Sequence, residues 1–387
     1  MERFDVAVIG AGLAGLTLTK ELSARGLSVL LVDRKTDLTE RIHTTGIFVR
    51  KTLEDFDLPA HCLGAAVRQV RLHSPARQCL QLRSPHDEFR VGRMGKLYSH
   101  LLEQAQNLGA VFMGDTHFLG SEDSGNTSVV RLERAGAALT LSARFVVGAD
   151  GAVSRVAQDL GLGLNKEFIV GIEDVFEGVP LVGEPCFDVF LEPQLAPGYI
   201  AWVVHDGEHV HLGTGGYAHA FDPVRALAVF QRNVSGIFDF TQARSLERRG
   251  GRIPVGGVLS NIANGRGLLL GDASGAVSPL TAGGLDPAIR QAHFAARVLE
   301  GHLGGHPDAL NTYNGSVWRA RFASRLWMRR LLTGVTQPAL LEVGFAALKH
   351  EPLKSLAWKV FFGRGGSFPE LGKPKSQSSA KTPAARG

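Results

Sequence analysis

The chain has 387 residues, of which 44% are hydrophobic and 20% are charged, a balance that fits a globular protein and excludes an intrinsically disordered one. The 47 glycines follow no collagen-like period, so they indicate turns and close backbone approaches. The net charge of +5 is unevenly spread, because residues 317–387 hold 13 Lys and Arg against 3 Asp and Glu (+10) and residues 1–316 hold 29 against 34 (−5).

The three cysteines are Cys62, Cys79 and Cys186. So sparse and odd a set predicts no disulfide framework and suits a reducing compartment. The first residues enter a strand pattern without a basic and apolar signal segment. No stretch of about 20 apolar residues is free of both charge and proline. We therefore expect a cytoplasmic protein without a membrane-spanning helix.

Residues 4–33 predict a strand, a tight turn, a helix that stops at Gly26, and a second strand. The turn reads Gly10-x-Gly12-x-x-Gly15. In a dinucleotide site the first glycine permits the turn, the second lets the pyrophosphate approach, and the third lets helix and strand pack closely. Asp33 ends the second strand, where a carboxylate accepts hydrogen bonds from the adenosine ribose.

The rest of the chain interrupts this nucleotide-binding pattern twice. The first predicted elements after residue 33 are antiparallel strands in 67–93, a helix in 96–110 that stops at Gly109, and a strand–turn–helix unit in 144–162. Residues 170–260 predict short strands with one helix at 223–235. A strand, a small-residue turn and a helix follow in 267–301, then mainly helix in 317–362 and a polar basic tail in 366–387. Strands at 146–150 and 268–272 return to the nucleotide-binding pattern. Three distant segments thus contribute to one nucleotide site, which favours FAD over NAD as the bound nucleotide.

Three motifs in this order resemble the flavoprotein oxidoreductases that include geranylgeranyl reductases and single-component aromatic hydroxylases: GAGLAG…VDRK, GADGAVSRV at 148–156, and GLLLGDASGAVSPLTAGGLDPAIRQA at 267–292. The resemblance covers about residues 1–300. It implies an α/β fold, with an FAD-binding Rossmann-like three-layer domain, an interleaved antiparallel-sheet substrate domain and a C-terminal helical segment. The expected limits are 1–66, 94–169 and 261–316 for the FAD-binding domain, 67–93 and 170–260 for the substrate domain, 317–365 for the helical segment and 366–387 for a disordered tail.

The resemblance also implies cofactor contacts. Asp272 would bind the ribityl chain, and residues 279–285 would pass the pyrimidine edge of the isoalloxazine. The positive end of a helix starting at Asp286-Pro287 would favour the negative charge of a reduced flavin. The full predicted set is Gly10, Gly12, Leu13, Ala14, Gly15, Asp33, Arg34, Arg41, Arg93, Asp150, Asp272, Pro279, Gly283, Gly284 and Leu285.

Two of these assignments have an alternative. Asp150 would lie near the pyrophosphate in the family, but it also suits the N-cap of a helix, with Arg155 pairing locally. Arg34 can cover the adenine simply as an exposed arginine stem.

Residues 196–216 resemble the Pro-x-x-Tyr-x-Trp-x-Phe-Pro stretch of the reductases, with Pro197, Tyr199 and Trp202 in place and Val204-His205 instead of Phe-Pro. We therefore expect a reductase or dehydrogenase that acts on carbon–carbon bonds of an apolar or lipid-like substrate, including prenyl groups, by hydride transfer at flavin N5. A monooxygenase using NAD(P)H and oxygen, and a non-catalytic FAD-bound electron carrier, stay open as alternatives. NAD(P)H is the candidate electron donor.

The candidates for catalysis are His43, Thr45, Tyr199 and Trp202. Thr44 and Thr45 stand in a loop where prenyl reductases often carry a cysteine. The HDGEHVH segment offers His205, His209 and His211, but no acid or cysteine completes a ligand set. We expect an exposed strand–turn–strand there and no metal site.

The segment VWRARFASRLWMRRLL interleaves Trp318, Phe322, Leu326, Trp327 and Leu331 with five arginines. It suits either a helix packed on the body with a solvated basic face or a helix that contacts an anionic membrane through residues 317–364. The expected partner is a small apolar substrate. No nucleic-acid-binding module accompanies the charge, and the sequence leaves the oligomeric state open.

Overall fold

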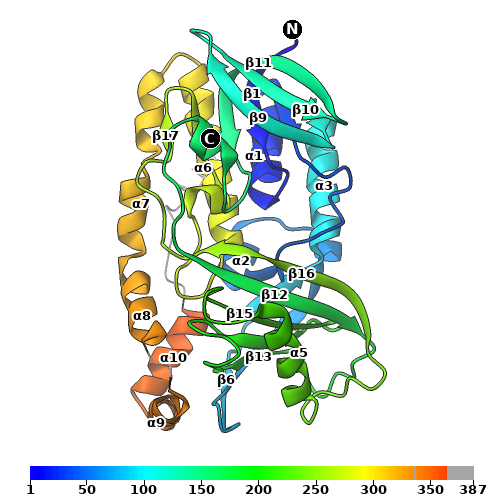
Figure 1. Cartoon of the computed structure of the whole chain (residues 1–387), viewed down its shortest axis with the longest axis vertical. Coiled ribbons are helices and arrows are strands. Elements are labelled where there is room, and N and C mark those ends of the chain that lie inside the picture. Colours follow the sequence, from blue (N-terminus) through cyan, green and yellow to red (C-terminus); the bar gives the residue numbers. More distant parts are fainter. Residues whose placement is uncertain (335–336, 364–387) are drawn as a thin grey trace, which may run out of the picture.

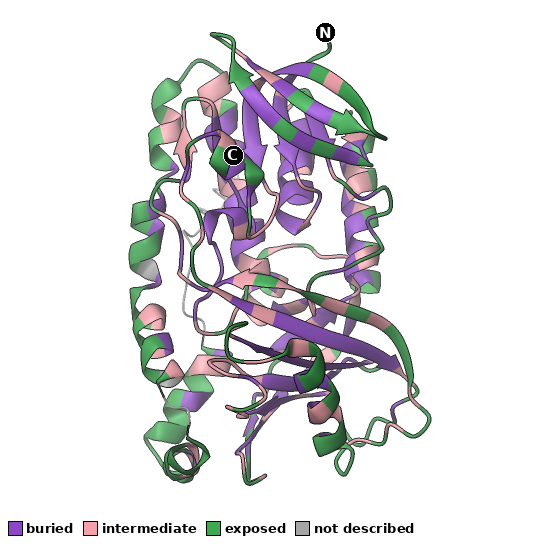
Figure 2. Ribbon diagram, viewed as in Figure 1, coloured by how far each residue is buried: buried purple, intermediate pink, exposed green. Residues whose placement is uncertain are grey.

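The computed structural model describes residues 1–334 and 337–363. Two lobes stand one above the other, each built on its own sheet, and the C-terminal helices run down one side of both (Figure 1). The strands of both sheets are largely buried, whereas these helices are mostly exposed (Figure 2). The mixed α/β architecture confirms the predicted fold class.

The upper lobe holds the strands of the three nucleotide-binding segments. β1 (Arg3–Ile9) pairs in parallel with both β2 (Val29–Val32) and β11 (Ala137–Gly148), and β11 pairs in parallel with β18 (Gly267–Leu269). The sheet is completed by β17 (Ala263–Asn264), β8 (Val111–Met113), β9 (Thr116–Asp123) and β10 (Ser128–Arg134). Its helices are α1 (Leu13–Ser23), α3 (Met94–Asn107), α4 (Arg155–Asp159) and α6 (Leu285–Leu303). Segments some 250 residues apart therefore share one sheet, as the motif order predicts.

The hairpin formed by β9 and β10 is absent from the predicted elements. It extends β11, whose first half pairs antiparallel with β10 while its second half pairs in parallel with β1. The signal was present, because Val130 and Leu132 alternate with polar residues and are fully buried.

The lower lobe is a seven-stranded sheet that takes strands from residues 67–93 and 170–260. Its order is β16 (Arg244–Pro254), β12 (Phe168–Glu177), β15 (Val210–Gly216), β14 (Ala201–His205), β13 (Cys186–Phe190), β5 (Gln69–His73) and β6 (Cys79–Arg83). α5 (Pro223–Val234) packs on β12 and β15, capped by the Asp222 carboxylate and started by a proline, as such helices often are.

A third, small sheet and a short helix lie between the lobes. β3 (Ile47–Val49), β7 (Phe89–Gly92) and β4 (Leu63–Val67) form the sheet, and α2 (Arg50–Asp55) follows β3. The domain boundary expected between residues 66 and 67 falls inside β4, which pairs with a strand of the neighbouring segment.

The C-terminal segment forms α7 (Gly315–Arg321), α8 (Ala323–Thr333), α9 (Pro338–Leu348) and α10 (Leu353–Phe362). Trp318 is only 2% exposed and packs edge-to-face on Phe294 and Tyr313 of the upper lobe. Phe345 and Phe362 are buried against the lower sheet. The segment therefore braces both lobes, and the interpretation of Trp318 as a membrane-facing residue is wrong. The tail expected at 366–387 lies outside the described residues, as do 364–365.

Gly15 and Gly12 allow a matched test of the first turn. A Cβ on Gly15 would lie 1.9 Å from the Gly10 carbonyl oxygen, whereas a Cβ on Gly12 meets no protein atom within 4 Å. Gly15→Ala should lower the free energy of unfolding of the apoprotein by about 3 kcal/mol or more, and Gly12→Ala should change it by less than about 1 kcal/mol. Urea denaturation measures both, and equal stability of the two variants would contradict this packing.

Candidate functional site

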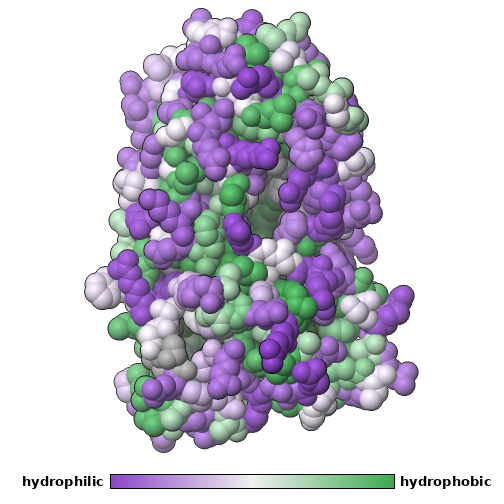
Figure 3. Space-filling model, viewed as in Figure 1, coloured by the Kyte–Doolittle hydropathy of each residue, from purple (hydrophilic) through white to green (hydrophobic). Residues whose placement is uncertain are grey.

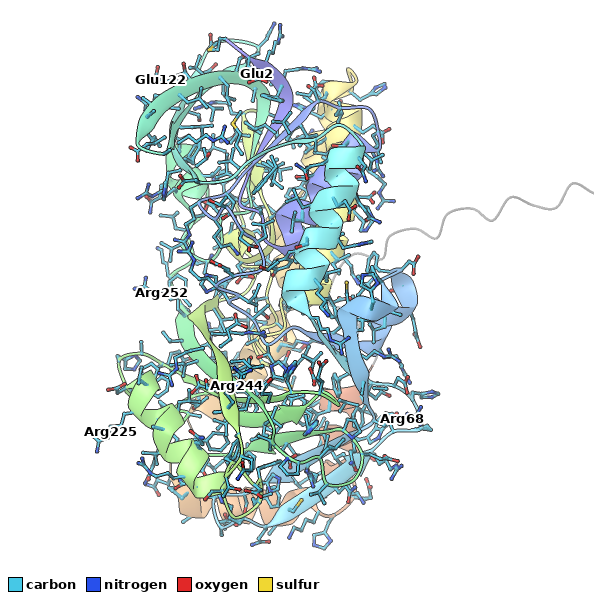
Figure 4. All side chains as sticks on the ribbon, turned by 90° about the vertical axis from the view of Figure 1, so that its right-hand side faces the viewer. Glu2, Arg68, Glu122, Arg225, Arg244 and Arg252 are labelled. Carbon is cyan, nitrogen blue, oxygen red and sulfur yellow. The ribbon has the colours of Figure 1, made fainter. Side chains whose placement is uncertain are left out.

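A cavity of about 1570 Å³ lies between the lobes, and Figure 3 shows a recess with hydrophobic walls at that level. All four catalytic candidates, His43, Thr45, Tyr199 and Trp202, line it. The predicted cofactor residues that line it are Gly10, Gly12, Leu13, Ala14, Asp33, Arg34, Arg41, Asp150, Asp272, Gly283, Gly284 and Leu285. Arg252, another lining residue, projects at the waist between the lobes (Figure 4).

The first glycine-rich turn forms one end of the cavity. Gly10 has φ +107°, and a Cβ there would lie 2.3 Å from the Ala149 carbonyl oxygen. The backbone N–H of Ala11 donates to Asp33 Oδ2 at 2.7 Å, which fixes the turn against the end of β2. No side chain caps α1 at Gly12. The first N–H groups of α1 therefore stay available for an anion such as a pyrophosphate.

The second glycine-rich turn forms the other end. The loop is held by hydrogen bonds from Ser278 N to Gly283 O (3.0 Å) and from Tyr199 Oη to Thr281 O (2.7 Å). α6 begins directly after it at Leu285, one residue before the predicted start, and its N-cap residue Gly284 offers no side-chain cap. Helix N–H groups and the positive end of the helix dipole thus face the loop.

Asp272 stands between the two turns. Burial alone raises the pKa of its carboxyl to about 6, and among the described residues no hydrogen bond from the protein reaches the carboxylate oxygens. Asp272 is half-buried, and a carboxylate withdrawn from water without donors is costly unless a ligand supplies them. The hydroxyls of a ribityl chain are donors of this kind, so Asp272 and the two open turns fit FAD.

Asp150 binds the first turn of α4 at the edge of the same cavity. Its carboxylate accepts hydrogen bonds from Ser154 Oγ (2.6 Å) and from the backbone N–H groups of Arg155 (2.7 Å) and Val156 (3.2 Å). Burial raises its pKa. The N-cap residue of α4 is Ser154, whose hydroxyl accepts from Ala157 N, and Asp150 binds further N–H groups of the same first turn, with the backbone of Arg155 as partner rather than its guanidinium. Contact of Asp150 with the pyrophosphate stays a prediction.

Three predicted cofactor residues do not line the cavity. Gly15 is buried in the turn. Arg93 pairs with Glu208 at 2.6 Å and donates to the carbonyls of His61 and Leu63. The Pro279 carbonyl accepts from Arg329. The geometry gives Arg93 and Pro279 structural partners, and their contact with FAD stays a prediction.

The wall opposite the nucleotide turn carries a buried polar cluster that the sequence analysis missed. Glu173 of β12 accepts hydrogen bonds from Thr45 Oγ1 and from Trp202 Nε1 (3.0 Å), and it lies 3.2 Å from His211 Nδ1. The other ring nitrogen of His211 lies 3.4 Å from Asp206 Oδ2. The available signal was the adjacent acids Glu173 and Asp174 in the middle of the apolar run of FIVGIEDVFE.

The strand–turn–strand expected at HDGEHVH is present, and its turn is exposed at Gly207 and Glu208. The expectation that its strands are exposed is wrong, because β14 and β15 are central strands of the sheet and are buried along their whole length. His205 and His211 are buried with them. In the described part of the chain no group of three or more His, Cys, Asp and Glu side chains is placed to hold a metal ion.

Comparison with known proteins agrees with this geometry. A family model described as "FAD binding domain" matches residues 3–179. The chain is 25% identical over 329 residues to a digeranylgeranylglycerophospholipid reductase of Methanocella arvoryzae, covering 82% of this chain and 83% of that protein.

The protein is an FAD-dependent oxidoreductase. It resembles the superfamily of geranylgeranyl reductases and single-component flavoprotein monooxygenases. A geranylgeranyl bacteriochlorophyll reductase-like structure from Thermoplasma acidophilum superposes with a TM-score of 0.79 at 19% identity, covering 94% of this chain and 97% of that one. p-Nitrophenol 4-monooxygenase from Pseudomonas putida superposes with a TM-score of 0.71 at 17% identity, covering 94% and 100%. Both structures share the fold of this oxidoreductase.

The Asp272 carboxylate provides a test in which stability and cofactor retention move in opposite directions. Because its pKa is raised in the folded protein, ionisation costs stability as the pH rises above the unfolded value near 3.8. Asp272→Asn should therefore stabilise the apoprotein at pH 7.5 by about 1–2 kcal/mol and lose that advantage below about pH 4. FAD retention, measured by equilibrium dialysis, should fall about tenfold or more.

The matched control is Asp286→Asn. Asp286 ion pairs with Arg290 at 2.9 Å and accepts from Thr52 at 2.8 Å, so this variant should destabilise the apoprotein at pH 7.5. A loss of apoprotein stability in Asp272→Asn would show that its carboxylate is satisfied by the protein.

Proposed function

We propose that this oxidoreductase is a reductase or dehydrogenase that acts on carbon–carbon double bonds of an elongated apolar substrate, with a prenyl lipid as the favoured class. The observation that carries the proposal is the size and lining of the cavity. About 1570 Å³ exceeds the roughly 300–1,000 Å³ of a pocket for one small ligand. The cavity therefore has room for FAD and a second long molecule.

The composition of the lower sheet supports one location for that molecule. One register row crosses the sheet through Arg249, Glu173, Gly213, Trp202, Val189 and Leu72. Its polar end adjoins the loop that contains Thr45, and its apolar end runs under the C-terminal helices. Leu72, Phe89, Phe187, Val189, Leu348 and Val360 line this apolar end. A chain of isoprene units fits such a lining because burial of its methyl and methylene groups supplies the affinity.

The reductase activity is favoured over the hydroxylase alternative by the relatives named as prenyl reductases and by the Tyr199–Trp202 pair. The two rings pack edge-to-face with centroids 6.4 Å apart. The Tyr199 hydroxyl donates a hydrogen bond to the Thr281 carbonyl of the second glycine-rich turn, and the Trp202 indole donates one to Glu173. When bound, reduced FAD supplies the hydride, and the chain orients the double bond and excludes water. NAD(P)H is the proposed electron donor.

Oxygen dependence separates the two activities. Dithionite-reduced enzyme, mixed anaerobically with a digeranylgeranylglycerophospholipid or with geranylgeranyl diphosphate, should be reoxidised and yield a product with fewer double bonds. A second arm replaces dithionite by NADPH and NADH. Product that forms only when oxygen is admitted, and that contains a new oxygen atom, would reverse the assignment in favour of a monooxygenase.

We also propose that the oxidoreductase contacts an anionic membrane through α8–α10. Trp327, Leu331 and Val343 are 65%, 68% and 72% exposed, and the same helices present the exposed cations Arg330, Lys349, Lys354 and Lys359. Leu331, Leu356 and Lys359 also line the cavity. These exposed apolar side chains therefore lie beside residues that line the cavity, where a lipid could pass from the bilayer into the cavity. Among residues 1–334 and 337–363 no helix combines the length and apolarity that crossing a membrane requires, so the proposed contact is peripheral.

Vesicle flotation tests this surface. A Trp327→Glu, Val343→Glu double variant should lose most binding to vesicles of phosphatidylglycerol and phosphatidylcholine, because both exposed apolar contacts become anionic. The matched control is Val224→Glu, which alters a 53% exposed valine on α5, a helix of the lower lobe remote from α8 (Figure 1). Equal flotation of all forms, or no preference for anionic vesicles, would refute the proposed contact.

A further inference from the structure

The Glu173 cluster is a buried polar chain that runs from the cavity to a surface turn. Glu173, His211 and Asp206 are each less than 7% exposed. Thr45, at the cavity end, lies in the 41–46 loop. Asp206, at the other end, opens the β14–β15 turn, in which Gly207 and Glu208 are exposed.

The loop that carries Thr45 is fixed onto β16. Ile42 N donates to Glu247, His43 Nδ1 lies 2.9 Å from the Gly250 carbonyl oxygen, and Arg249 Nη1 donates to the Thr44 carbonyl at 3.1 Å. These contacts leave the Thr45 hydroxyl facing Glu173 while Thr45 still lines the cavity.

The register of the sheet makes this cluster possible. Gly213 pairs with Glu173 on one side and with Trp202 on the other. A Cβ on Gly213 would lie 2.2 Å from the Trp202 ring. The absent side chain lets the indole cross the strand and donate to Glu173, which leaves the second carboxylate oxygen to His211.

Both ring nitrogens of His211 face carboxylates, so both must carry hydrogens for the contacts to be favourable. The two carboxylates raise the pKa of His211 to about 9, against the opposing effect of burial, and His211 in turn lowers the pKa of Glu173 and of Asp206. An imidazolium is therefore stored in the interior, separated from the cavity by Glu173, which itself lines the cavity.

We propose that Thr45, Glu173 and His211 form a proton relay that protonates the substrate carbon during double-bond reduction. The inference rests on the proposed reductase function. Reduction of a double bond adds a hydride to one carbon and a proton to the other, and reduced FAD supplies the hydride with its two electrons. The chain has to supply the proton, and Thr45 is the hydroxyl of this cluster that lines the cavity.

At rest Glu173 is a carboxylate that accepts from Thr45. In the relay, Glu173 first takes the Nδ1 proton of His211 and becomes a neutral carboxyl. The Thr45 O–H bond then breaks as the new C–H bond forms, and Thr45 takes the proton of that carboxyl, so that Thr45 ends as a hydroxyl, Glu173 as a carboxylate and His211 as a neutral imidazole. The neutral His211 is recharged from solvent through Asp206 and the exposed turn. Thr45 is the catalytic residue, and Glu173 and His211 act through it.

Several other charged or titratable groups influence His211. Arg249 of β16 lies 3.7 Å from Glu173 and favours its ionised form. His205 of β14 and the imidazolium of His211 mutually oppose protonation, which contributes to the lowered pKa of His205. His209, in the turn, donates its backbone N–H to Asp206. The two carboxylates in direct contact outweigh these groups, so His211 stays charged at neutral pH.

Two measurements on the FAD-loaded protein test the relay. The first is the titration of the His211 ring by ¹H–¹³C NMR, assigned with His211→Gln. The signal should be that of an imidazolium at pH 7.5, and Glu173→Gln should lower its midpoint by about one unit or more. The second is anaerobic flavin reoxidation by geranylgeranyl diphosphate. Thr45→Val should slow it about 100-fold, with the KM within about threefold of wild type, and Thr45→Ser should restore most of the rate.

His209→Gln is the matched control, since it removes an imidazole from the same turn and should change neither measurement. A neutral His211 at pH 7.5, or reoxidation of Thr45→Val at the wild-type rate, would overturn the relay. If the wild-type protein reduces no prenyl acceptor, the proposed function fails. The titration then still decides whether His211 stores a proton beside Glu173. A charged His211 that depends on Glu173 supports the proton store, and a neutral one refutes it.

Discussion

The close approach of two backbone segments at the first turn is the constraint on which the rest of the structure depends. Gly10, Gly15 and Ala149 come from two segments that are distant in sequence, and their contacts admit no Cβ on either glycine. This packing places the N-terminus of α1 beside the end of β11, and β11 in turn pairs with β18. Asp272 follows β18, so the same contact fixes the distance between the two turns that would hold the ends of one FAD.

The second constraint lies in the lower sheet. A central strand normally excludes charge, yet β12 carries Glu173 and β15 carries His211. Burial of these charges is tolerable because each is paired and hydrogen-bonded on both sides. A structural role alone would be served equally well by apolar residues. Polar residues at this one end of an otherwise apolar wall indicate a requirement of the chemistry rather than of folding.

The sequence predicted those features that local rules control. The glycine spacing, the parallel strands of residues 4–33 and the helix at 223–235 follow from backbone conformation and periodicity, whereas the role given to Asp272 came from the family resemblance. What the sequence missed depends on strand register. The contact of Glu173 with Trp202 needs Gly213 between them, and no local pattern reveals which strands become neighbours. The burial of His211 was missed for the same reason, since a polar HDGEHVH segment resembles a surface turn until its neighbours are known. Trp318 kept two interpretations because an aromatic residue among arginines suits both a core and a membrane surface, and its packing on Phe294 and Tyr313 selects the core.

In the proposed reaction the cavity reduces a carbon–carbon double bond with hydride from flavin and a proton relayed by the chain. The decisive measurement is mass spectrometry of the product formed anaerobically in D₂O by dithionite-reduced enzyme, because the flavin hydride exchanges with solvent. We expect each double bond lost from the prenyl chain to be replaced by two deuterium atoms, with no oxygen gained. A product that carries an added oxygen atom, or one that retains all its double bonds, would contradict it.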